Sequence, residues 1–474
     1  MTTPAPLLER TSRRGLLTLA AVTIGSGVAL LDGTIVGIAL PTIGRDLGSS
    51  LSGLQWINNG YVLTLASLVL VGGGLGDRWG RRRVYLVGMA WFALASLGCA
   101  MAPSTDWLIV GRMLQGVGAA LLTPGGLAII QSSFHPRDRP WAIGTWAGVS
   151  GIATAIGPFV GGWILDHLSW HWIFAVNVPL CAGVIALSLF AVPESRDVES
   201  TGSFDLAGAG ATVVTLGALT WVLTSGPGAK GAALALAGTV VVLGVVGFVI
   251  AETRASRPLV PFALFRSPVF AAANLMTLLV YGALGSMMFV LVIQLQTSAG
   301  WSPLASGLAT LPVTVLLLLL SPRMAELAQR TGPRLPMSVG PLVCTAGVLL
   351  LSAVGPGTGW PLVIAGMTVF ALGLATLVSP LTSAVLAAAP DRLAGSASGI
   401  NNAVARTGTL LAVAAIPSLV GLSGDDYTDP AALTQGYRLA AFVIAGLLVA
   451  GGAVSWAGLR PRPDVEPART PSSR

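Results

Sequence analysis

Charged side chains are scarce in this sequence. Only 9% of the 474 residues are Asp, Glu, Lys or Arg, whereas about one quarter is typical of a soluble domain. The hydrophobic fraction is 54%, and the mean hydropathy is +0.80. A chain of this composition exposes too much apolar surface for water, which excludes a soluble enzyme, a disordered protein and a secreted disulfide scaffold. The composition predicts a polytopic membrane protein.

Lysine and cysteine are nearly absent. Lys230 is the only lysine, and the remaining positive charge comes from arginines in short clusters between apolar runs. Such clusters orient helices in a membrane, so the net charge of +7 does not indicate a nucleic-acid partner. The cysteines, Cys99, Cys181 and Cys344, lie in separate apolar runs with no partner at metal-ligand spacing. No Gly-x-x-x-x-Gly-Lys-Ser/Thr motif occurs, so we expect no ATP-driven transport, no metal and no other cofactor.

Long apolar runs, by contrast, are abundant. A helix needs about 20 mostly apolar residues to cross the hydrocarbon core of a bilayer. The runs are continuous rather than alternating, which excludes a transmembrane β-barrel and predicts an all-α protein. The sequence predicts fourteen transmembrane helices, near residues 15–40, 54–75, 84–102, 107–131, 141–165, 171–192, 205–224, 231–251, 269–296, 304–324, 336–354, 360–388, 396–420 and 437–458.

The arginine clusters predict the orientation of these helices. With the N-terminus in the cytoplasm, 21 of the 26 Lys and Arg residues fall on the cytoplasmic side and 3 on the outer side. Positive residues accumulate on the cytoplasmic side of membrane proteins. We therefore expect a multi-pass protein of the plasma membrane with both termini in the cytoplasm.

The sequence also contains an internal repeat. The segment 77–82, Asp-Arg-Trp-Gly-Arg-Arg, aligns with Gln-Arg-Thr-Gly-Pro-Arg at 329–334. The two copies are 252 residues apart. That distance is too long for six helices but suits six helices plus an extra pair, as in duplicated transporters. The predicted organisation is a cytoplasmic N-terminus, a six-helix half, a two-helix insertion, a second six-helix half and a cytoplasmic tail, at residues 1–14, 15–200, 201–257, 258–459 and 460–474.

The first copy of this repeat resembles the signature loop of the major facilitator superfamily. Its residues are Gly73-x-Leu75-x-Asp77-Arg78-x-Gly80-Arg81-Arg82. Two further segments resemble the proton-coupling motif and the antiporter motif of that superfamily, namely Leu108-x-x-x-Arg112-x-x-Gln115-Gly116-x-Gly118 and Gly157-Pro158-x-x-Gly161-Gly162. The resemblance implies a major facilitator fold and a transporter rather than an enzyme.

Three more segments are similar to the fourteen-helix drug:proton antiporters within that superfamily. They are Leu31-Asp32-x-Thr34-Ile35-Val36-x-x-Ala39-Leu40-Pro41, the segment from Pro258-Leu259-Val260-Pro261 to Leu264-Phe265-Arg266, and Gly395-x-Ala397-Ser398-Gly399-x-Asn401-Asn402. Among relatives, these segments resemble antibiotic exporters of the methylenomycin-resistance type. The resemblance implies proton-driven export of small hydrophobic drug-like or antibiotic molecules by a chain that works as a monomer in the lipid bilayer.

Three positions depart from the family pattern. Gly37 stands where the family has Asn, Trp170-His171-Trp172 replaces Trp-Arg-Trp, and Arg406-Thr407 replaces Arg-Gln. Gly37 and Thr407 lie in predicted spans, so the substrates of a relative cannot be assumed for this chain.

Asp32 is the principal candidate for proton coupling. It is the only acidic residue deep in a predicted span, and a carboxylate there costs about 2.5–3.5 kcal/mol on insertion scales. We predict that Asp32 binds a proton or a cationic substrate alternately, with Arg112 and Gln115 nearby as partners. The alternatives are a solvated Asp32 at the outer interface and an Arg112 that only satisfies backbone carbonyls between helices.

Other motif residues have a predicted conformational or binding role. Asp77, with Arg78, Arg81 and Arg82, is expected to lock a cytoplasmic gate together with Gly73 and Gly80, the alternative being charge that only sets topology and meets lipid. Gly157, Pro158, Gly161 and Gly162 suit a close, kinked helix interface, the alternative being generic packing. Asn401, Asn402 and Arg406 form a possible second-half site for anionic groups or for hydrogen bonds between helices. Trp56, Tyr61, Trp146 and Tyr281 are candidates for an aromatic cavity, although packing is the simpler role.

The function predicted from the sequence is thus a proton-coupled antiporter that exports small molecules by alternating access. A proton-coupled metabolite transporter on the same fold is the nearest alternative. A membrane channel or receptor is the alternative from another class.

Overall fold

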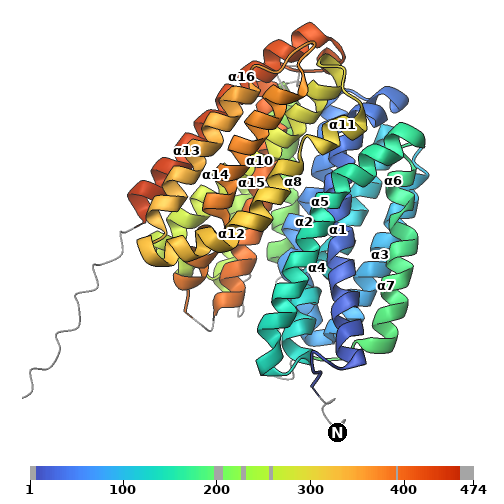
Figure 1. Cartoon of the computed structure of the whole chain (residues 1–474), viewed down its shortest axis with the longest axis vertical. Helices are drawn as coiled ribbons and strands as arrows, with labels where there is room; N and C mark the ends of the chain where they lie inside the picture. Colours follow the sequence, from blue (N-terminus) through green and yellow to red (C-terminus); the bar gives the residue numbers. More distant parts are fainter. Residues whose placement is uncertain (1–6, 197–205, 226–230, 256–259, 391–392, 460–474) are drawn as a thin grey trace, which may run out of the picture.

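The computed structural model describes residues 7–196, 206–225, 231–255, 260–390 and 393–459. Its regular structure in these residues is helical, which confirms the all-α prediction (Figure 1). The boundaries at 200/201 and 257/258, the segment Pro258-Leu259 and the tail 460–474 lie outside the described residues.

The helices fall into three groups along the chain. The first group contains α1 (Arg13–Leu47), α2 (Leu51–Trp79), α3 (Arg81–Ala100), α4 (Thr105–Ser133), η1 (Pro136–Asp138), α5 (Arg139–His167), α6 (Trp172–Ala175) and α7 (Asn177–Ala191). The second contains α8 (Leu206–Thr224) and α9 (Gly231–Arg254). The third contains η3 (Phe262–Arg266), α10 (Pro268–Ile293), η4 (Gln294–Ser298), α11 (Pro303–Leu308), α12 (Leu311–Thr331), α13 (Arg334–Leu351), α14 (Trp360–Ala387), α15 (Ala394–Leu419), η6 (Asp426–Thr428) and α16 (Pro430–Gly458).

Local sequence sets the ends of these helices. Serine caps the N-terminus of α1, α2 and α4, where the hydroxyls of Ser12, Ser50 and Ser104 each accept a hydrogen bond from a first-turn amide. Gly48 ends α1 in the left-handed conformation, at φ 59°, which glycine adopts without steric cost. The connections between successive helices are short, so neighbouring helices run antiparallel.

Twelve helical segments are long and apolar enough to cross a membrane, two fewer than the fourteen expected. The two expected spans that fall short are α8 and α15. The apolar part of α8, Gly208–Thr224, is short. α15 has the length, at 26 residues, but it carries Asn401, Asn402 and Arg406 in its interior. These polar residues interrupt the apolar stretch of α15, so it is not among the twelve candidate spans.

The two larger groups repeat one packing pattern. In the first, α2 and α3 pack on α4, α1 packs on α5, and α7 packs on α1 and α3. In the second, α12 and α13 pack on α14, α10 packs on α15, and α16 packs on α10 and α13. We call these groups the N-half and the C-half. Their helices occupy two sides of the molecule in Figure 1.

The described hydrogen bonds between the two halves lie at the end drawn at the top of Figure 1, called the upper end below. The Gln55 amide of α2 donates to the carbonyls of Val413 and Ala414 in α15, at 2.7 and 3.0 Å. The Val413 carbonyl is available because its partner four residues later is Pro417, which has no N–H. Tyr427 adds a hydrogen bond from its hydroxyl to the Ser49 carbonyl, at 2.7 Å. The N-half and the C-half are thus joined at the upper end.

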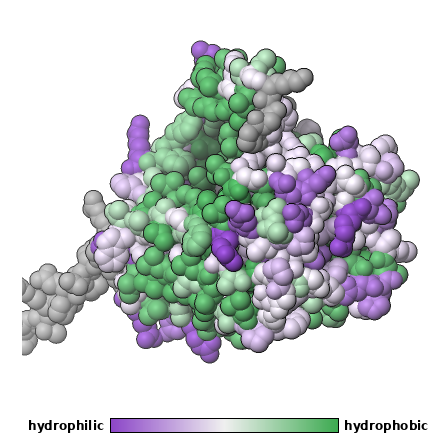
Figure 2. Space-filling model, turned by 90° about the horizontal axis from the view of Figure 1, so that it is seen from above, coloured by the Kyte–Doolittle hydropathy of each residue, from purple (hydrophilic) through white to green (hydrophobic). Residues whose placement is uncertain are grey.

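The extra pair of helices lies at the edge of this bundle. α8 packs against α2 of the N-half and against α15 of the C-half, and α9 packs on α8. Hydrophobic side chains of α9, among them Leu236, Val242 and Leu243, are exposed. Figure 2 looks onto the upper end and shows hydrophobic residues over much of the outline of the molecule. Such a surface suits contact with lipid.

Candidate functional site

Asp32 of α1 and Arg112 of α4 form a buried ion pair. An Nη1 of Arg112 lies 2.5 Å from Oδ2 of Asp32. Side-chain exposure is 0% for Asp32 and 1% for Arg112, so neither is solvated at an interface. A single buried charge in this position is costly, and each of these charges is compensated by the other. The two residues that sequence reasoning selected for coupling therefore lie in direct contact.

Three neutral polar side chains complete the coordination of the pair. Gln115, one turn after Arg112, accepts from Arg112 Nη1 at 2.7 Å and donates to Asp32 Oδ1 at 3.2 Å. Asn177, the first residue of α7, also donates to Asp32 Oδ1, at 2.8 Å. Ser96 of α3 accepts from the amides of Gln115 and Asn177, at 2.8 and 3.4 Å. Helices α1, α3, α4 and α7 thus meet at one polar cluster inside the N-half.

Aromatic rings cover the guanidinium of Arg112. Its centre lies 4.4 Å from the ring centroid of Tyr61 on α2 and 5.9 Å from that of Phe174 on α6. Its Nε donates to the Ile57 carbonyl at 3.3 Å. A guanidinium over an aromatic face gains attraction from the ring quadrupole, and the gain is larger when water is excluded. Arg112 is therefore held in place independently of Asp32.

Three hydrogen-bond donors surround the carboxyl group of Asp32. Its two oxygens accept three hydrogen bonds, from Arg112, Gln115 and Asn177, and a proton on the carboxyl group would turn one of these two acceptor oxygens into a donor. The Asn177 Oδ1 atom is buried without a hydrogen-bond partner among the described residues. That oxygen offers an acceptor for a protonated carboxyl group. The cluster thus places one free acceptor beside the three donors that contact Asp32.

Sequence reasoning missed Ser96, Asn177 and Phe174 as members of this cluster. Ser96 and Asn177 stand inside the predicted spans 84–102 and 171–192, and a hydrogen-bonding side chain within an apolar run was the available signal. Asn177 also begins α7 directly after the break that follows α6. Serine is common in membrane helices, so that signal alone does not identify Ser96.

The signature loop between α2 and α3 is bound to the end of α7. Asp77 pairs with Arg81 one turn later, at 2.7 Å. Gly80 has φ 108° and lies against the carboxylate of Glu194, which accepts hydrogen bonds from the amides of Arg82 and Arg83, at 3.1 and 3.2 Å. Glu194 thus compensates the free N–H groups and positive dipole end of α3, a role that the sequence did not reveal.

The remaining residues of this loop lie close by. Arg82 Nη1 donates to the Val192 carbonyl at 3.1 Å. Gly73 faces Pro124 of α4, where an added Cβ would be 3.6 Å from the proline ring. Arg78 lies in the last turn of α2, between Asp77 and Gly80. The described contacts of Asp77 and Glu194 are within the N-half.

The antiporter motif on α5 lies between the two halves. Gly157 and Gly161 face Thr34 and Ile35 of α1. Gly162 faces the backbone of α11, and a Cβ on Gly162 would be 2.5 Å from the Cα of Leu304. The carbonyl of Pro158 meets Gly307 of α11 in the same way. Small residues at this crossing let the α5 and α11 backbones touch.

The second-half candidates divide into two environments. The Asn401 amide donates to Asn274 Oδ1 at 3.2 Å and to Thr277 Oγ1 at 2.8 Å, both on α10, so this residue joins two helices within the C-half. Asn402 is exposed. Arg406 is partly buried, and its Nε has no hydrogen-bond partner in the described part of the chain. The structure thus separates Asn401 from Asn402 and Arg406.

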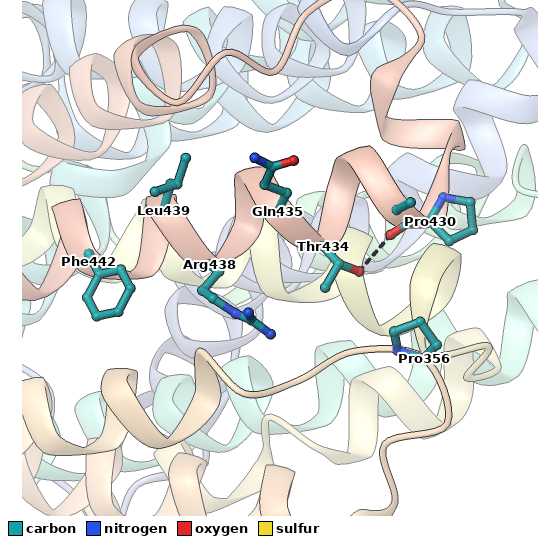
Figure 3. Close-up of a pocket in the computed structure, with 8 residues that line it drawn as sticks. Pro356, Pro430, Thr434, Gln435, Arg438, Leu439 and Phe442 are labelled. Atoms are coloured by element: carbon teal, nitrogen blue, oxygen red, sulfur yellow. Dashed lines mark hydrogen bonds between the residues drawn. The ribbon is translucent and has the colours of Figure 1, made fainter.

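A surface depression of about 370 Å³ lies at the upper end of α16, apart from the Asp32 cluster (Figure 3). Thr434, Gln435, Arg438 and Phe442 line it on α16, and Pro356 faces them from the α13–α14 connection. Thr434 donates to the Pro430 carbonyl at 2.6 Å. This depression contains none of the residues that the motifs selected.

The fold and the buried polar cluster define a membrane transporter built of two similar halves. A family model described as "Major Facilitator Superfamily" matches residues 22–413, and the chain belongs to that superfamily. The expectation of a transporter rather than an enzyme is therefore confirmed.

Similar curated proteins are drug and antibiotic exporters or resistance proteins by name. The tetracenomycin C resistance and export protein of Streptomyces glaucescens is 35% identical over 416 residues, which are 87% of this chain and 77% of the relative. The methylenomycin A resistance protein of Bacillus subtilis is 34% identical over 93% of this chain and 95% of the relative. The multidrug efflux pump LfrA of Mycolicibacterium smegmatis is 31% identical over 87% of this chain and 82% of the relative. The resemblance to antibiotic exporters is confirmed.

Solved structures support the fold. The chain aligns with the nucleoside transporter NupG at a TM-score of 0.66 and 14% identity, covering 94% of this chain and all of the other. A POT family transporter in complex with 5-aminolevulinic acid aligns at a TM-score of 0.69 and 16% identity, over 92% of this chain and 95% of that structure. At such identities the likeness concerns the fold alone.

Proposed function

We propose that this protein is a proton-coupled antiporter that exports small hydrophobic drug-like or antibiotic molecules from the cell. The buried Asp32–Arg112 pair carries the proposal, because a transporter driven by protons needs a group that exchanges one within the membrane. The names of the similar proteins support export rather than uptake. A proton-coupled metabolite transporter has the same fold and remains the alternative that the transport assay tests.

The proton acts on the balance between the two charges. When Asp32 is ionised, it holds Arg112 through a charged hydrogen bond, and Gln115 and Asn177 stabilise its second oxygen. A proton on Asp32 removes the charge that Arg112 compensates. Arg112 then depends on Tyr61, Phe174 and the Ile57 carbonyl. This change in packing between α1 and α4 is the step that biases the protein between its two access states.

The orientation follows from the charge distribution. We propose that the upper end faces outward and that both termini lie in the cytoplasm of a plasma-membrane protein. We also propose that α8 and α15 span the bilayer, giving fourteen transmembrane helices. At 1.5 Å per residue the 26 residues of α15 extend about 39 Å, and the 19 residues of α8 about 28 Å, against a hydrocarbon core of about 30 Å. One chain contains both halves and so suffices as the functional unit.

The motif residues have conformational roles in this cycle. Gly162 and the Pro158 carbonyl seal α5 against α11 when the upper end is closed. Asp77, Arg81 and the Glu194-bound start of α3 form a rigid corner at the opposite end. We propose that this corner meets the C-half when the cytoplasmic end closes, with Gly73, Arg78, Gly80 and Arg82 shaping it.

Transport in everted membrane vesicles tests the proposal. An imposed proton gradient, acid inside, should drive uptake of a lipophilic drug into vesicles that contain the wild type, and a protonophore should abolish it. Vesicles with Asp32→Asn at equal expression should not concentrate the drug. Drug flux that ignores the gradient and does not saturate would indicate a channel, and gradient-driven movement in the opposite direction would indicate an uptake symporter.

A further inference from the structure

The depression at the upper end of α16 changes from polar to apolar along the helix. Thr434, Arg438 and Phe442 follow one another at intervals of four residues, so they point to the same side of α16, and Pro356 faces them from the opposite wall (Figure 3). The Thr434 hydroxyl accepts a hydrogen bond from the Gln294 amide at 3.0 Å, which fixes the polar end of this wall. A hydroxyl, a guanidinium and an aromatic ring in this order suit an amphiphilic ligand.

The exposed face of α16 places Arg438 at the edge of the hydrocarbon core. Phe442, Val449 and Trp456 recur every seven residues, and all three are exposed, so they form one apolar stripe along the helix. The step from Arg438 to Trp456 corresponds to about 27 Å at 1.5 Å per residue, close to the thickness of about 30 Å of the hydrocarbon core. At the far end of the stripe the Arg334 guanidinium lies 4.0 Å from the Trp456 ring centroid, and tryptophan is enriched at membrane–water interfaces. Arg438 therefore lies where the acyl chains of the leaflet at the upper end meet their headgroups.

The positive charge of Arg438 is uncompensated at this level. None of the ion pairs among the described residues includes it, and α16 contains no acidic residue. Asp429, which precedes α16, accepts from the Ala431 amide at 2.9 Å and so compensates the positive end of the helix dipole. A guanidinium binds phosphate oxygens through two parallel hydrogen bonds. The charge therefore favours a phosphate group in the depression, whose volume of about 370 Å³ is at the lower end of the range for ligand pockets and suits a headgroup.

We propose that this depression binds the phosphate headgroup of an anionic phospholipid, with Arg438 on the phosphate and one acyl chain along Phe442. Gln435 also lines the depression, and its amide donates to further headgroup oxygens. The chain continues along the apolar stripe toward Val449. In the proposed orientation the lipid belongs to the outer leaflet. The site lies apart from the Asp32 cluster, so the inference goes beyond the proposed export function and does not depend on it.

Native mass spectrometry of the full-length protein in a neutral detergent tests this site by counting bound lipids. The protein is titrated with dioleoyl phosphatidylglycerol and with dioleoyl phosphatidylcholine, which has the same chains and phosphate but a compensating positive charge. A hydrogen bond to a charged partner contributes enough to predict that the first phosphatidylglycerol binds about tenfold more tightly than phosphatidylcholine. Arg438→Gln should remove this preference. Arg438→Lys keeps the charge without the two parallel donors and should keep part of the preference. Glycerol phosphate, which has no acyl chains, should bind at least about tenfold more weakly than phosphatidylglycerol.

Arg45 supplies the matched control. It is an exposed arginine in the last turn of α1, and it does not line the depression, so Arg45→Gln should leave the preference unchanged. Phe442→Ala removes apolar contact and should weaken the binding of both dioleoyl lipids without changing that of glycerol phosphate.

Four results would overturn the proposal. They are equal binding of the two lipids by the wild type, a preference that survives in Arg438→Gln, a preference that Arg45→Gln also removes, and glycerol phosphate that binds as tightly as the lipid. The last result would indicate a site for free phosphate. Thermal unfolding without added lipid shows whether each variant is folded, and the comparison of the three ligands on the wild type tests the proposal even where a variant is not.

Discussion

The ion pair between Asp32 and Arg112 makes a quantitative prediction about single and double variants. In Asp32→Asn the Arg112 charge stays buried without a carboxylate, and in Arg112→Gln the Asp32 charge stays buried without a guanidinium. Breaking a buried pair in this way costs about 3–5 kcal/mol. Each single variant should therefore lower the free energy of unfolding by about that amount. The double variant contains neither charge, so its loss should be smaller than the sum of the single losses.

The expected coupling between the two sites is about 0.5–3 kcal/mol, the range found for residues in direct contact. The remaining polar groups favour this outcome, because the Asn177 amide can turn its unpaired Oδ1 toward a neutral neighbour. Denaturant unfolding in mixed micelles measures the stability of all four proteins. Transport in everted vesicles measures the coupling function of the same four preparations.

Stability and transport should separate in this cycle. The double variant should lose less stability than the sum of the two single variants and still fail to export, because it has no carboxylate to exchange a proton. Asp32→Glu keeps an ionisable group and should restore part of the export. The reasoning is wrong if Asp32→Asn concentrates drug as the wild type does. It is also wrong if the double variant is destabilised by the full sum of the two single losses.

Three further predictions concern the gate, the interface and the topology. Asp77→Asn removes a partly exposed i,i+4 pair worth about 0.3–0.5 kcal/mol, so the protein should fold normally yet export poorly. Normal efflux at equal expression would show that Asp77 is ordinary loop charge. Gly162→Ala puts a methyl group against the Leu304 backbone, which should lower the free energy of unfolding by about 1–3 kcal/mol and prevent closure of the upper end. Thiol labelling at that end measures the closure. Gly183 faces open space, so Gly183→Ala should change neither. A cysteine at Ser423 should react with an impermeant thiol reagent in whole cells, and one at Arg330 should not. The three native cysteines are buried and should give little background labelling. The reverse pattern would invert the proposed topology.

Sequence reasoning located the charged members of the site and missed its neutral ones. Asp32 and Arg112 stood out because an ionised group within an apolar run is expensive, whatever the fold. Their direct contact could not be predicted, since it depends on how α1 and α4 pack. Asn177 and Ser96 carry no such penalty and become recognisable only once α3 and α7 meet at Asp32.

The fold shows the same division between local and long-range information. The positions of the helices follow from the apolar runs, but α15 carries Asn401, Asn402 and Arg406 in its interior and is not among the twelve segments that are apolar enough to cross a membrane. The role of Glu194 depends on contact between the end of α7 and the start of α3, which are more than a hundred residues apart. Nothing near Glu194 in the sequence indicates that contact.

The placement of α8 makes the two seams between the halves differ in how they meet the bilayer. On one side, α8 covers the seam between α2 and α15, so a lipid tail or a membrane-dissolved compound meets α8 before it meets the space between the halves. On the other side, α5 meets α11 and α12 directly, and the described helices include no such cover. In the proposed export cycle, we expect a compound dissolved in the membrane to reach the space between the halves from the α5–α11 side. If the halves separate on the α8 side, α8 still lies between the lipid and the seam of α2 and α15.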